Sequence, residues 1–393
     1  MSKHRIAYIE THPIQYKAHF FKKLAARREI DLTVYFFSDW GSKEYLDPQF
    51  GKKIKWDTDL LEGYRNFFLK NFSPRPDPST FFGTLNPGIV SELIRKKYDA
   101  VIIGGYNVLS HYFAYAGALL GGSPVFFAGD TAIRSRHFLP SDLVKKPLLG
   151  ALFSATSAFL TVGTRSEQFY ESFGIKKDKF FFCPLTVDND FFIAESDRLR
   201  KEKESSKATL GIPPEMPVIL FVGKLADHKK PGDLLSAYEG LREKAALVFV
   251  GEGAQRRLLE ERACAKGLQR VFFPGFVNQT ELPKFYALGD IFVLPSSYEL
   301  NPLVFNEAMC CALPVVASDA ICSVIDCVKE GENGGVFRCG DIAGLKDKLD
   351  TLLGDGELRA KMGRASREMI KSRHPSVAVN GVVEACRAHA KKR

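Results

Sequence analysis

The feature that most constrains the fold of this chain is a repeated alternation between short apolar runs and longer segments with helical spacing. Within the runs, apolar residues follow one another without regular polar interruption. Strands of that kind are buried on both faces, as in a parallel sheet that helices cover on either side. The pattern therefore predicts an α/β fold with doubly wound parallel sheets. In the first half of the chain the runs occupy residues 5–10, 31–38, 99–105, 124–130, 158–163 and 179–185.

A second series of the same kind predicts a second domain. We place the first domain at residues 1–187 and the second at residues 188–374, and we expect the final helical segment, residues 375–393, to pack back on the first domain. Two Rossmann-like domains of this kind should face a central cleft at the carboxyl ends of their strands, where such folds bind ligands. The runs of the second series occupy residues 217–223, 246–253, 271–277, 290–297, 314–319 and 335–337.

One stretch, residues 39–87, breaks this alternation. It is rich in aromatic residues, glycine and proline, and glycine and proline favour turns and irregular structure. We predict that this stretch is a large loop excursion of the first domain over the sheet edge or the cleft.

Positive charge is concentrated in the first half of the chain. Residues 1–187 hold 25 lysines and arginines against 17 aspartates and glutamates, whereas residues 188–393 hold 30 against 29. A basic surface favours an anionic partner such as nucleic acid, a phosphorylated substrate or a membrane surface, although a bias toward solubility remains an alternative. No recognised nucleic-acid motif is present, so we expect no nucleic-acid partner.

The chain lacks the sequence signatures of several common classes of protein. It has no window of 18 uninterrupted apolar residues, and it enters a strand-like run at residue 5 without the apolar stretch of a secretory signal. Its eight cysteines form no CxxC pair, and its histidines offer no zinc spacing. The first strand is followed by THPIQYK instead of a GxGxxG motif. We therefore expect a cytoplasmic protein with reduced thiols and neither a dinucleotide cofactor nor a metal.

Two carboxylates flank the beginning of a predicted helix. Glu299 follows the apolar run 290–297, and Glu307 lies eight residues later in a segment of helix-forming composition. A helix that begins at the end of a strand offers unpaired backbone N–H groups to a phosphate. Glu307 is then placed to accept the hydroxyls of a ribose, and Glu299 those of a transferred sugar. Solvated charges on a helix surface also explain the spacing, and the pattern taken alone favours that reading.

The same stretch resembles the C-terminal motif of retaining glycosyltransferases of the GT-B fold, glycosyltransferase family 4, also called group 1. In that family an acidic residue is followed, after seven others, by Glu-Ala, a turn of small residues and Pro-Val-Val-Ala, which here corresponds to residues 299–319. Residues 221–235, 271–297 and 330–337 are similar to further family motifs in the family's order. The resemblance covers roughly residues 180–345.

The resemblance assigns the second domain to the nucleotide sugar and the first domain to the acceptor. It implies that the basic residues after the strand 217–223 hold the diphosphate, and that the loop around residues 275–277 receives the nucleobase. Pro302 stands where many members have glycine, and proline has no N–H group, so only the next two amides remain for phosphate. The expected donor-binding residues are Gly223, Lys224, Lys229, Phe276, Val277, Leu303, Val304 and Glu307, with Glu299 as a catalytic residue.

In the first domain the resemblance is looser. The segment THPIQYK resembles a subgroup in which His12 would face the cleft, but a histidine that caps a helix start is an equally good reading. Asp130 stands where several members have a histidine, which leaves open whether it contacts the donor sugar instead. Arg134 would orient Asp130 or bind the acceptor. The predicted catalytic residues are thus His12, Asp130 and Glu299, with Arg134 as the acceptor-binding candidate.

The resemblance implies transfer of a sugar, with retention of configuration, from a UDP-sugar or, less favoured, a GDP-sugar. The acceptor would be a glycan, a lipid-linked molecule or a small molecule, in the synthesis of cell-surface polysaccharide or glycoconjugates. Neither a cofactor nor a metal is expected, because cationic side chains and helix dipoles neutralise the leaving diphosphate. The sequence Asp57-Thr58-Asp59 imitates the metal motif of the other glycosyltransferase fold, but it lies in the excursion and not at a strand end.

Two further expectations concern location and alternative functions. The basic first domain predicts a peripheral position on the anionic inner face of the membrane. An epimerase of nucleotide sugars with the GT-B fold and a non-catalytic nucleotide-sugar-binding protein remain open as alternative functions.

Overall fold

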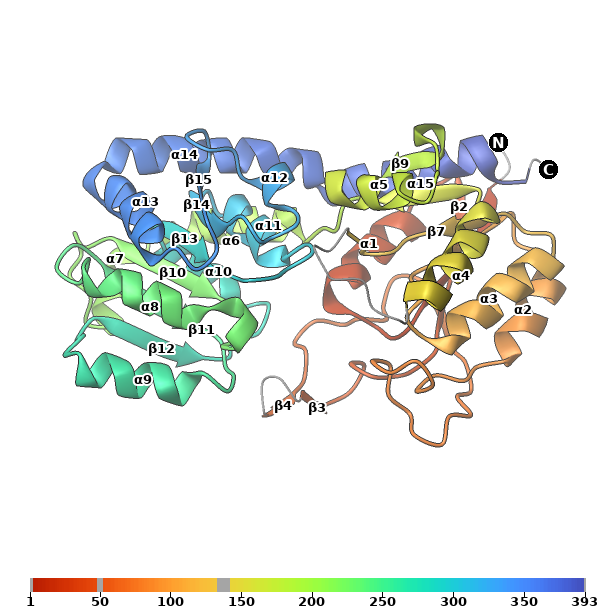
Figure 1. Cartoon of the computed structure of the whole chain (residues 1–393), viewed down its shortest axis with the longest axis horizontal. Helices are drawn as coiled ribbons and strands as arrows, with labels where there is room; N and C mark the ends of the chain where they lie inside the picture. Colours follow the sequence, from red (N-terminus) through yellow and green to blue (C-terminus); the bar gives the residue numbers. More distant parts are fainter. Residues whose placement is uncertain (1–2, 48–51, 133–141, 392–393) are drawn as a thin grey trace. The chain divides into compact units, whose positions relative to one another are not determined.

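The computed structural model describes residues 3–47, 52–132 and 142–391 and is shown in Figure 1. The chain folds into two compact units. The first consists of Met1–Glu44, Asp59–Thr186 and Pro375–Arg393, and the second of Tyr45–Thr58 and Val187–His374. The chain therefore passes between the units several times.

The first unit is built on a seven-stranded sheet in which every pairing is parallel. The strand order is β5-β2-β1-β6-β7-β8-β9, so the direction of winding reverses between β1 and β6. Ligands of such sheets bind beyond the carboxyl ends of the strands at the point of reversal. The strands are β1 (His4–Glu10), β2 (Ile30–Phe36), β5 (Arg65–Phe68), β6 (Ala100–Ile103), β7 (Val125–Phe127), β8 (Ala158–Thr161) and β9 (Phe180–Phe182).

Helices cover both faces of this sheet (Figure 1). Along β1, Ile6 and Tyr8 belong to one apolar core and Ala7 and Ile9 to another, because successive side chains of a strand point to opposite faces. The C-terminal helix α15 contributes several buried side chains to the core that contains Ile6. The helices are α1 (Gln15–Ala25), α2 (Gly88–Lys96), α3 (Leu109–Leu120), α4 (Asp142–Ser154), α5 (Thr164–Glu171), η1 (Lys177–Lys179) and α15 (Pro375–His389).

The second unit contains a six-stranded parallel sheet with the order β12-β11-β10-β13-β14-β15. Its winding reverses between β10 and β13. The strands are β10 (Val218–Val222), β11 (Ala246–Val250), β12 (Val271–Gly275), β13 (Ile291–Leu294), β14 (Val315–Ser318) and β15 (Gly334–Phe337).

The helices of the second unit surround this sheet and share one large apolar core with it. They are α6 (Asn189–Arg200), α7 (Lys203–Thr209), η2 (Asp227–Lys229), α8 (Pro231–Glu239), α9 (Arg256–Ala265), α10 (Leu282–Leu288), α11 (Leu303–Cys310), α12 (Val324–Cys327), α13 (Ile342–Gly354), α14 (Gly356–Met369) and η3 (Ile370–Arg373).

Each apolar run that the sequence analysis identified forms a strand, so the predicted α/β class with two parallel, Rossmann-like sheets is confirmed. The mutual placement of the two units across a cleft stays a prediction.

The prediction for residues 39–87 needs correction. This stretch contains a strand, β5, that pairs with β2 at the edge of the first sheet. It also contains an antiparallel hairpin of β3 (Tyr45–Asp47) and β4 (Lys52–Ile54). The sequence did not predict β5, because an edge strand keeps much of its surface in water and needs no unbroken apolar run. Its sequence RNFF is mostly exposed. The segment Tyr45–Thr58 packs with the second unit, although the residues on both sides of it belong to the first.

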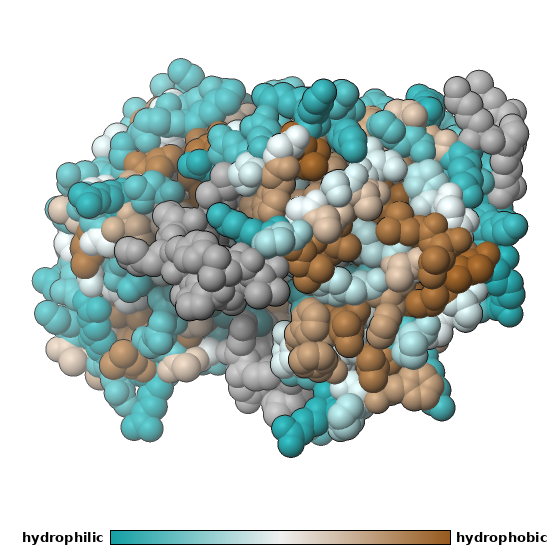
Figure 2. Space-filling model, turned by 45° about the vertical axis from the view of Figure 1, so that its right-hand side comes forward, coloured by the Kyte–Doolittle hydropathy of each residue, from teal (hydrophilic) through white to brown (hydrophobic). Residues whose placement is uncertain are grey.

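Several large apolar side chains of the first unit remain exposed. Phe72 is 53% exposed and Phe82 72% exposed, and Phe67, Phe68 and Phe81 are each at least 40% exposed. Figure 2 turns the first unit toward the viewer and shows hydrophobic side chains gathered on the face that it presents. Exposed apolar patches of this kind commonly mark an interaction surface.

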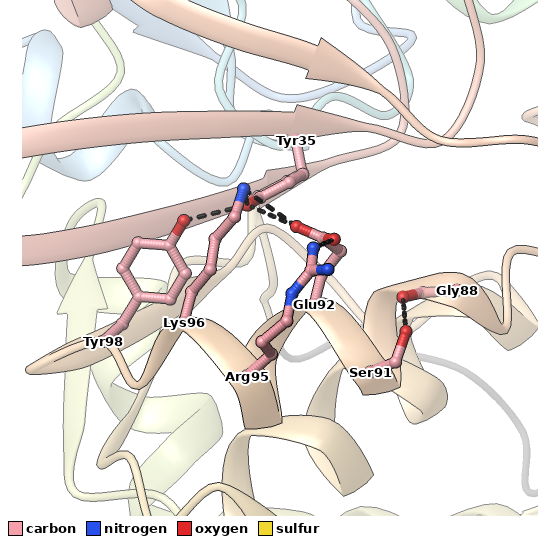
Figure 3. A network of polar contacts seen from close by, with 7 residues as sticks. All are labelled: Tyr35, Gly88, Ser91, Glu92, Arg95, Lys96 and Tyr98. Carbon is pink, nitrogen blue, oxygen red and sulfur yellow. Dashed lines mark hydrogen bonds and ion pairs between the residues drawn. The ribbon is translucent and has the colours of Figure 1, made fainter.

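A polar network next to this surface joins α2 to β2 (Figure 3). The hydroxyl of Tyr35 lies 2.9 Å from that of Tyr98 and accepts a hydrogen bond from Lys96 Nζ at 2.8 Å. Lys96 also pairs with Glu92 at 2.8 Å and lies 4.8 Å from the ring centre of Phe67. The ammonium of Lys96 is therefore largely occupied by contacts within the first unit.

Candidate functional site

Glu299 and Glu307 lie on the connection between β13 and α11. Glu299 follows the end of β13 by five residues, and Glu307 is the fifth residue of α11. The backbone of this connection is held by the turn before α12, since Cys322 N donates to Glu299 O at 2.9 Å and Ser323 N to Leu300 O at 3.0 Å. The structure therefore places both carboxylates on the elements that the sequence predicted.

The side chain of Glu299 forms an ion pair with Lys229, which lies in η2 after the end of β10. The two side chains are only 17% and 13% exposed, so water screens this pair weakly. The fold thus brings the predicted catalytic carboxylate against a cation that the sequence analysis assigned to the diphosphate.

His228 is a neighbour of this pair that the sequence analysis missed. Its Nε2 atom lies 4.0 Å from Glu299 Oε1, and its carbonyl oxygen accepts a hydrogen bond from Ser297 N at 2.7 Å. The second contact ties η2 to the segment that follows β13. In the sequence, only the position of His228 directly before Lys229 could have indicated that it lies near the site.

Close backbone packing positions the residues after β10. Gly251 has a φ of +142°, and a Cβ atom there would lie 1.9 Å from the carbonyl oxygen of Gly223. A Cβ atom on Gly253 would lie 2.4 Å from the carbonyl oxygen of Leu225. Only glycine allows such an approach. The Gly-x-Gly sequence therefore lets the turn after β11 pack against the segment that carries Lys224.

The start of α11 is open to an anion. Its N-cap residue, Pro302, is extended, and no side chain caps the helix in the part of the chain that the structure describes. Proline contributes no N–H group, so Leu303 and Val304 supply the first two amides of the helix. These amides, together with the helix dipole, favour a phosphate at this position.

Glu307 is buried and not a solvated surface charge. It is 5% exposed, and Tyr286 of α10 donates a hydrogen bond to its Oε2 atom at 2.6 Å. Burial raises the pKa of Glu307 to about 7, although hydrogen bonds from Tyr286 and Gln279 oppose the shift. The burial excludes the reading of Glu307 as a surface charge. Tyr286 was missed because its proximity to Glu307 depends on how α10 packs against α11.

The predicted nucleobase loop follows β12 and contacts the segment Tyr45–Thr58. Phe276 lies with its ring centre 6.3 Å from that of Trp56, and Asn278 Nδ2 donates to Lys55 O at 2.8 Å. The sequence analysis placed Trp56 in a loop of the first domain and assigned it no role.

In the first unit a cavity of about 170 Å³ lies at the carboxyl ends of the strands. A buried ion pair between Glu10 and Lys17 lines it. Burial raises the pKa of Glu10, and the nearby ammonium of Lys17 opposes this shift. Residues from five strand ends line the cavity, among them Glu10, Gly104, Ala128, Asp130, Val162 and Cys183.

His12 lies beside this cavity. Its Nδ1 atom is 2.9 Å from the hydroxyl of Thr11, which lines the cavity. Burial lowers the pKa of His12 to about 4, so the imidazole is neutral near pH 7. Helix α1 begins after Ile14 without a side-chain cap, and the reading of His12 as a helix cap is therefore wrong.

The remaining predicted residues have separate outcomes. Asp130 is exposed at the rim of the cavity, and Arg134 lies outside the described residues. Asp57 and Asp59 accept backbone hydrogen bonds from Thr280 at 3.0 Å and from Leu61 at 2.9 Å. Across residues 3–47, 52–132 and 142–391, no group of three or more His, Cys, Asp or Glu side chains could hold a metal ion.

Comparison with known proteins identifies the second half of the chain. Residues 202–369 match the family described as glycosyl transferases group 1. This region is similar to the group 1 glycosyltransferases. The family resemblance expected from residues 180–345 is therefore confirmed.

The match to named relatives covers only part of the length of each relative. The chain is 37% identical over 184 residues to the sulfoquinovosyl transferase SQD2 of Arabidopsis thaliana, which covers 46% of this chain and 34% of that protein. It is 31% identical over 220 residues to a D-inositol 3-phosphate glycosyltransferase of Xylanimonas cellulosilytica, covering 54% and 52%. The matched segment thus spans about a third to a half of these relatives.

Solved structures extend the likeness to nearly the whole chain. The structure of Anabaena Alr3699/HepE in complex with UDP has a TM-score of 0.75 at 16% identity and covers 98% of this chain and 100% of that one. A glycosyltransferase of Rickettsia africae has a TM-score of 0.75 at 14% identity and covers 98% of each chain. At such identities the likeness shows the fold alone, which is GT-B. No helix in the described residues has the length and hydrophobicity to span a bilayer.

Proposed function

We propose that this protein is a retaining glycosyltransferase that moves a sugar from a nucleotide diphosphate sugar to an acceptor hydroxyl. The observation that carries the proposal is the shielded pairing of Glu299 with Lys229 beside the open start of α11. The match of residues 202–369 to the group 1 family and the glycosyltransferase names of the relatives support it. A UDP-sugar is the favoured donor, because the HepE structure was solved with UDP, and a GDP-sugar is the next candidate.

The chemistry needs stabilisation of a leaving nucleoside diphosphate. An ammonium has three N–H donors, so Lys229 can hold Glu299 and a phosphate oxygen at the same time. Lys224 and the first amides of α11 would add further positive potential where the negative charge develops. Groups that are already oriented toward developing charge stabilise the transition state without reorganisation. Glu299 would hold hydroxyls of the sugar ring as it becomes oxocarbenium-like.

In this proposal the bond to the acceptor oxygen forms on the same face of the sugar from which the diphosphate leaves. The acceptor proton passes to an oxygen of the departing diphosphate, so no protein nucleophile and no metal are required. The leaving charge is balanced by Lys224, Lys229 and the dipole of α11.

The acceptor would bind in the first unit, at the cavity lined by Asp130 and the Glu10–Lys17 pair. The neutral imidazole of His12 can exchange hydrogen bonds with a hydroxyl, and Asp130 can accept one. We propose a glycan, lipid-linked or small-molecule acceptor, used in cell-surface polysaccharide or glycoconjugate synthesis.

A thermal-shift panel of nucleoside diphosphates and nucleotide sugars is the first test of the proposed function. A ligand at 100 times its dissociation constant should add about 2.7 kcal/mol to the free energy of unfolding. The stabilising donor is then incubated with and without candidate acceptors, and the products are separated. A new sugar nucleotide formed without acceptor would favour an epimerase, and binding with neither hydrolysis nor transfer would favour a binding protein. If no nucleotide in the panel stabilises the protein, the proposal is contradicted.

We also propose that the protein is cytoplasmic and associates peripherally with an anionic membrane surface through its first unit. The specific observation is the group of exposed aromatic side chains that includes Phe72 and Phe82, together with Lys70, whose Nζ lies 4.8 Å from the ring centre of Phe72. Aromatic residues insert at the headgroup level, and lysine is attracted to anionic lipid. The excess of positive charge over residues 1–187 supports the same orientation.

A further inference from the structure

Residues 52–58 belong to the second unit, although the residues on both sides of Tyr45–Thr58 in the sequence belong to the first. We call Lys52–Thr58 the inserted segment, because the residues before Tyr45 and after Thr58 belong to the first unit while the segment itself packs with the second. Its backbone and side chains bond to the loop after β12. Asn278 Nδ2 donates to Lys55 O at 2.8 Å, and both the backbone N and Oγ1 of Thr280 donate to Asp57 Oδ2, at 3.0 and 2.5 Å.

These bonds hold the indole of Trp56 against Phe276. The two ring centres are 6.3 Å apart, and the ring planes are inclined by 55°. Both side chains are only partly buried. An aromatic pair that keeps some of its surface accessible can stack against a further planar group.

The same loop leads directly to Glu307. Gln279, three residues after Phe276, forms a hydrogen bond with the Glu307 carboxylate. If Glu307 holds the ribose, the attached base must lie beside it, since the glycosidic bond joins the two rings directly. The loop from Phe276 to Gln279 therefore runs from the ribose position to the face of Trp56.

We propose that Trp56 is a further donor-binding residue, stacking against the nucleobase and forming with Phe276 the aromatic wall of the base subsite. The proposal rests on the proposed function. Stacking tolerates every base, so Trp56 supplies affinity while the loop after β12 supplies selection among bases. A lost base–aromatic stack should weaken nucleotide binding by about tenfold to a hundredfold.

The chain offers a direct reporter, because it contains two tryptophans, Trp40 and Trp56. Trp40 lies in the first unit and outside the proposed donor site. In a Trp40→Phe variant, Trp56 is the single indole. We expect UDP or GDP to change its emission saturably, with a midpoint equal to the calorimetric dissociation constant. Inorganic pyrophosphate, which lacks a base, should bind without that change.

Two substitutions of Trp56 in the otherwise natural chain distinguish stacking on the nucleobase from anchoring of the loop that carries Phe276. Trp56→Leu retains apolar contact with Phe276 but removes the planar face, and it should weaken UDP binding at least tenfold while leaving pyrophosphate binding unchanged. Trp56→Phe retains a planar face and should recover most of the affinity. Thermal unfolding of each variant in the absence of nucleotide shows whether the fold is retained.

The outcomes distinguish this inference from the proposed function. If the natural chain binds UDP or GDP but Trp56→Leu binds it equally well, or Trp56 emission stays constant at saturation, the inference is overturned and the proposed function stands. Equal weakening of UDP and pyrophosphate by Trp56→Leu would also overturn it, because the ring would then act as an anchor for the loop. If the natural chain binds no nucleotide, both fail together.

Discussion

Tyr286 donates its hydroxyl hydrogen to Glu307 at 2.6 Å, between two residues that are both buried in the second unit. The contact links α10 to α11, and burial of the carboxyl raises its pKa from an ordinary value of 4.5 to about 7. A carboxylate that binds ribose hydroxyls must therefore lose its proton in the physiological range. This relationship should make stability depend on pH, and with it the proposed binding of a nucleotide at Glu307.

Stability should fall between about pH 5 and pH 7 through Glu307. In this range the unfolded chain has released the proton and the folded chain retains it, so raising the pH favours unfolding. A shift of this size corresponds to about 3 kcal/mol. The variant Glu307→Gln lacks this titration, so its stability relative to the natural chain should rise with pH and level off above pH 7. Chemical denaturation at pH 5, 6, 7 and 8 measures this difference, and parallel pH profiles for the two proteins would refute the assignment.

Tyr286→Phe provides a control for the same prediction. The hydrogen bond from Tyr286 lowers the pKa of Glu307, so its removal should move the Glu307 titration to higher pH. UDP binding should then also require a higher pH. An unchanged midpoint would show that the hydroxyl of Tyr286 has no influence on the carboxyl.

Lys229→Ala and Lys224→Ala should both weaken diphosphate binding. Each change removes charge-assisted hydrogen bonds, which contribute about 1.5–3 kcal/mol apiece. Calorimetric titration with UDP and GDP measures the loss, and unchanged affinity in both variants would contradict the assignment.

Removal of Lys229 should also change the stability of the protein, because Lys229 forms an ion pair with Glu299. Its removal leaves the shielded Glu299 carboxylate without its cation, which should destabilise the protein by about 3 kcal/mol. The double variant Lys229→Ala/Glu299→Ala should recover part of that loss. Denaturant unfolding of both single variants and of the double variant gives the coupling energy, and additivity of the single changes would show that the pair contributes nothing.

Glu299 should matter for turnover and Glu307 mainly for binding. Loss of a group that stabilises the transition state typically lowers kcat by a factor on the order of 10²–10³, so we expect that effect for Glu299→Gln. Ribose is unchanged during the reaction, so Glu307→Gln should raise KM with a smaller effect on kcat. Steady-state kinetics with the identified donor and acceptor test both. The opposite pattern would reverse the two roles, and two fully active variants would show that neither carboxylate takes part.

Association with membranes should depend on the exposed aromatic side chains of the first unit. Phe82→Ser and Lys70→Ser should each reduce co-sedimentation of the full chain with vesicles that contain anionic lipid, and added salt should weaken binding of the natural chain. Leu258→Ser is a matched control, because Leu258 is 57% exposed but belongs to the second unit. Equal binding to neutral vesicles, or none to either kind, would rule out the proposal.

Local sequence was sufficient to predict most of the fold. Buried parallel strands need unbroken apolar runs, so β1 and β13 could be recognised without knowledge of their neighbours. The positions of Glu299 after β13 and of Glu307 within α11 followed from the same local pattern and from the family resemblance. Strand β5 could not be recognised in this way, because an edge strand with exposed faces carries no distinctive apolar run.

The amino-acid sequence by itself determined the two parallel-sheet domains, the group 1 motifs and the elements on which the predicted donor residues lie. Tertiary structure alone decided that Tyr286 meets Glu307, that Lys229 pairs with Glu299, and that the inserted segment with Trp56 packs on the loop of Phe276. Strand and helix patterns arise from neighbours along the chain, whereas these contacts join residues 21, 70 and 220 positions apart. Contacts at such separation, and the burial that raises the pKa of Glu307, depend on how whole elements pack, which periodicity does not encode.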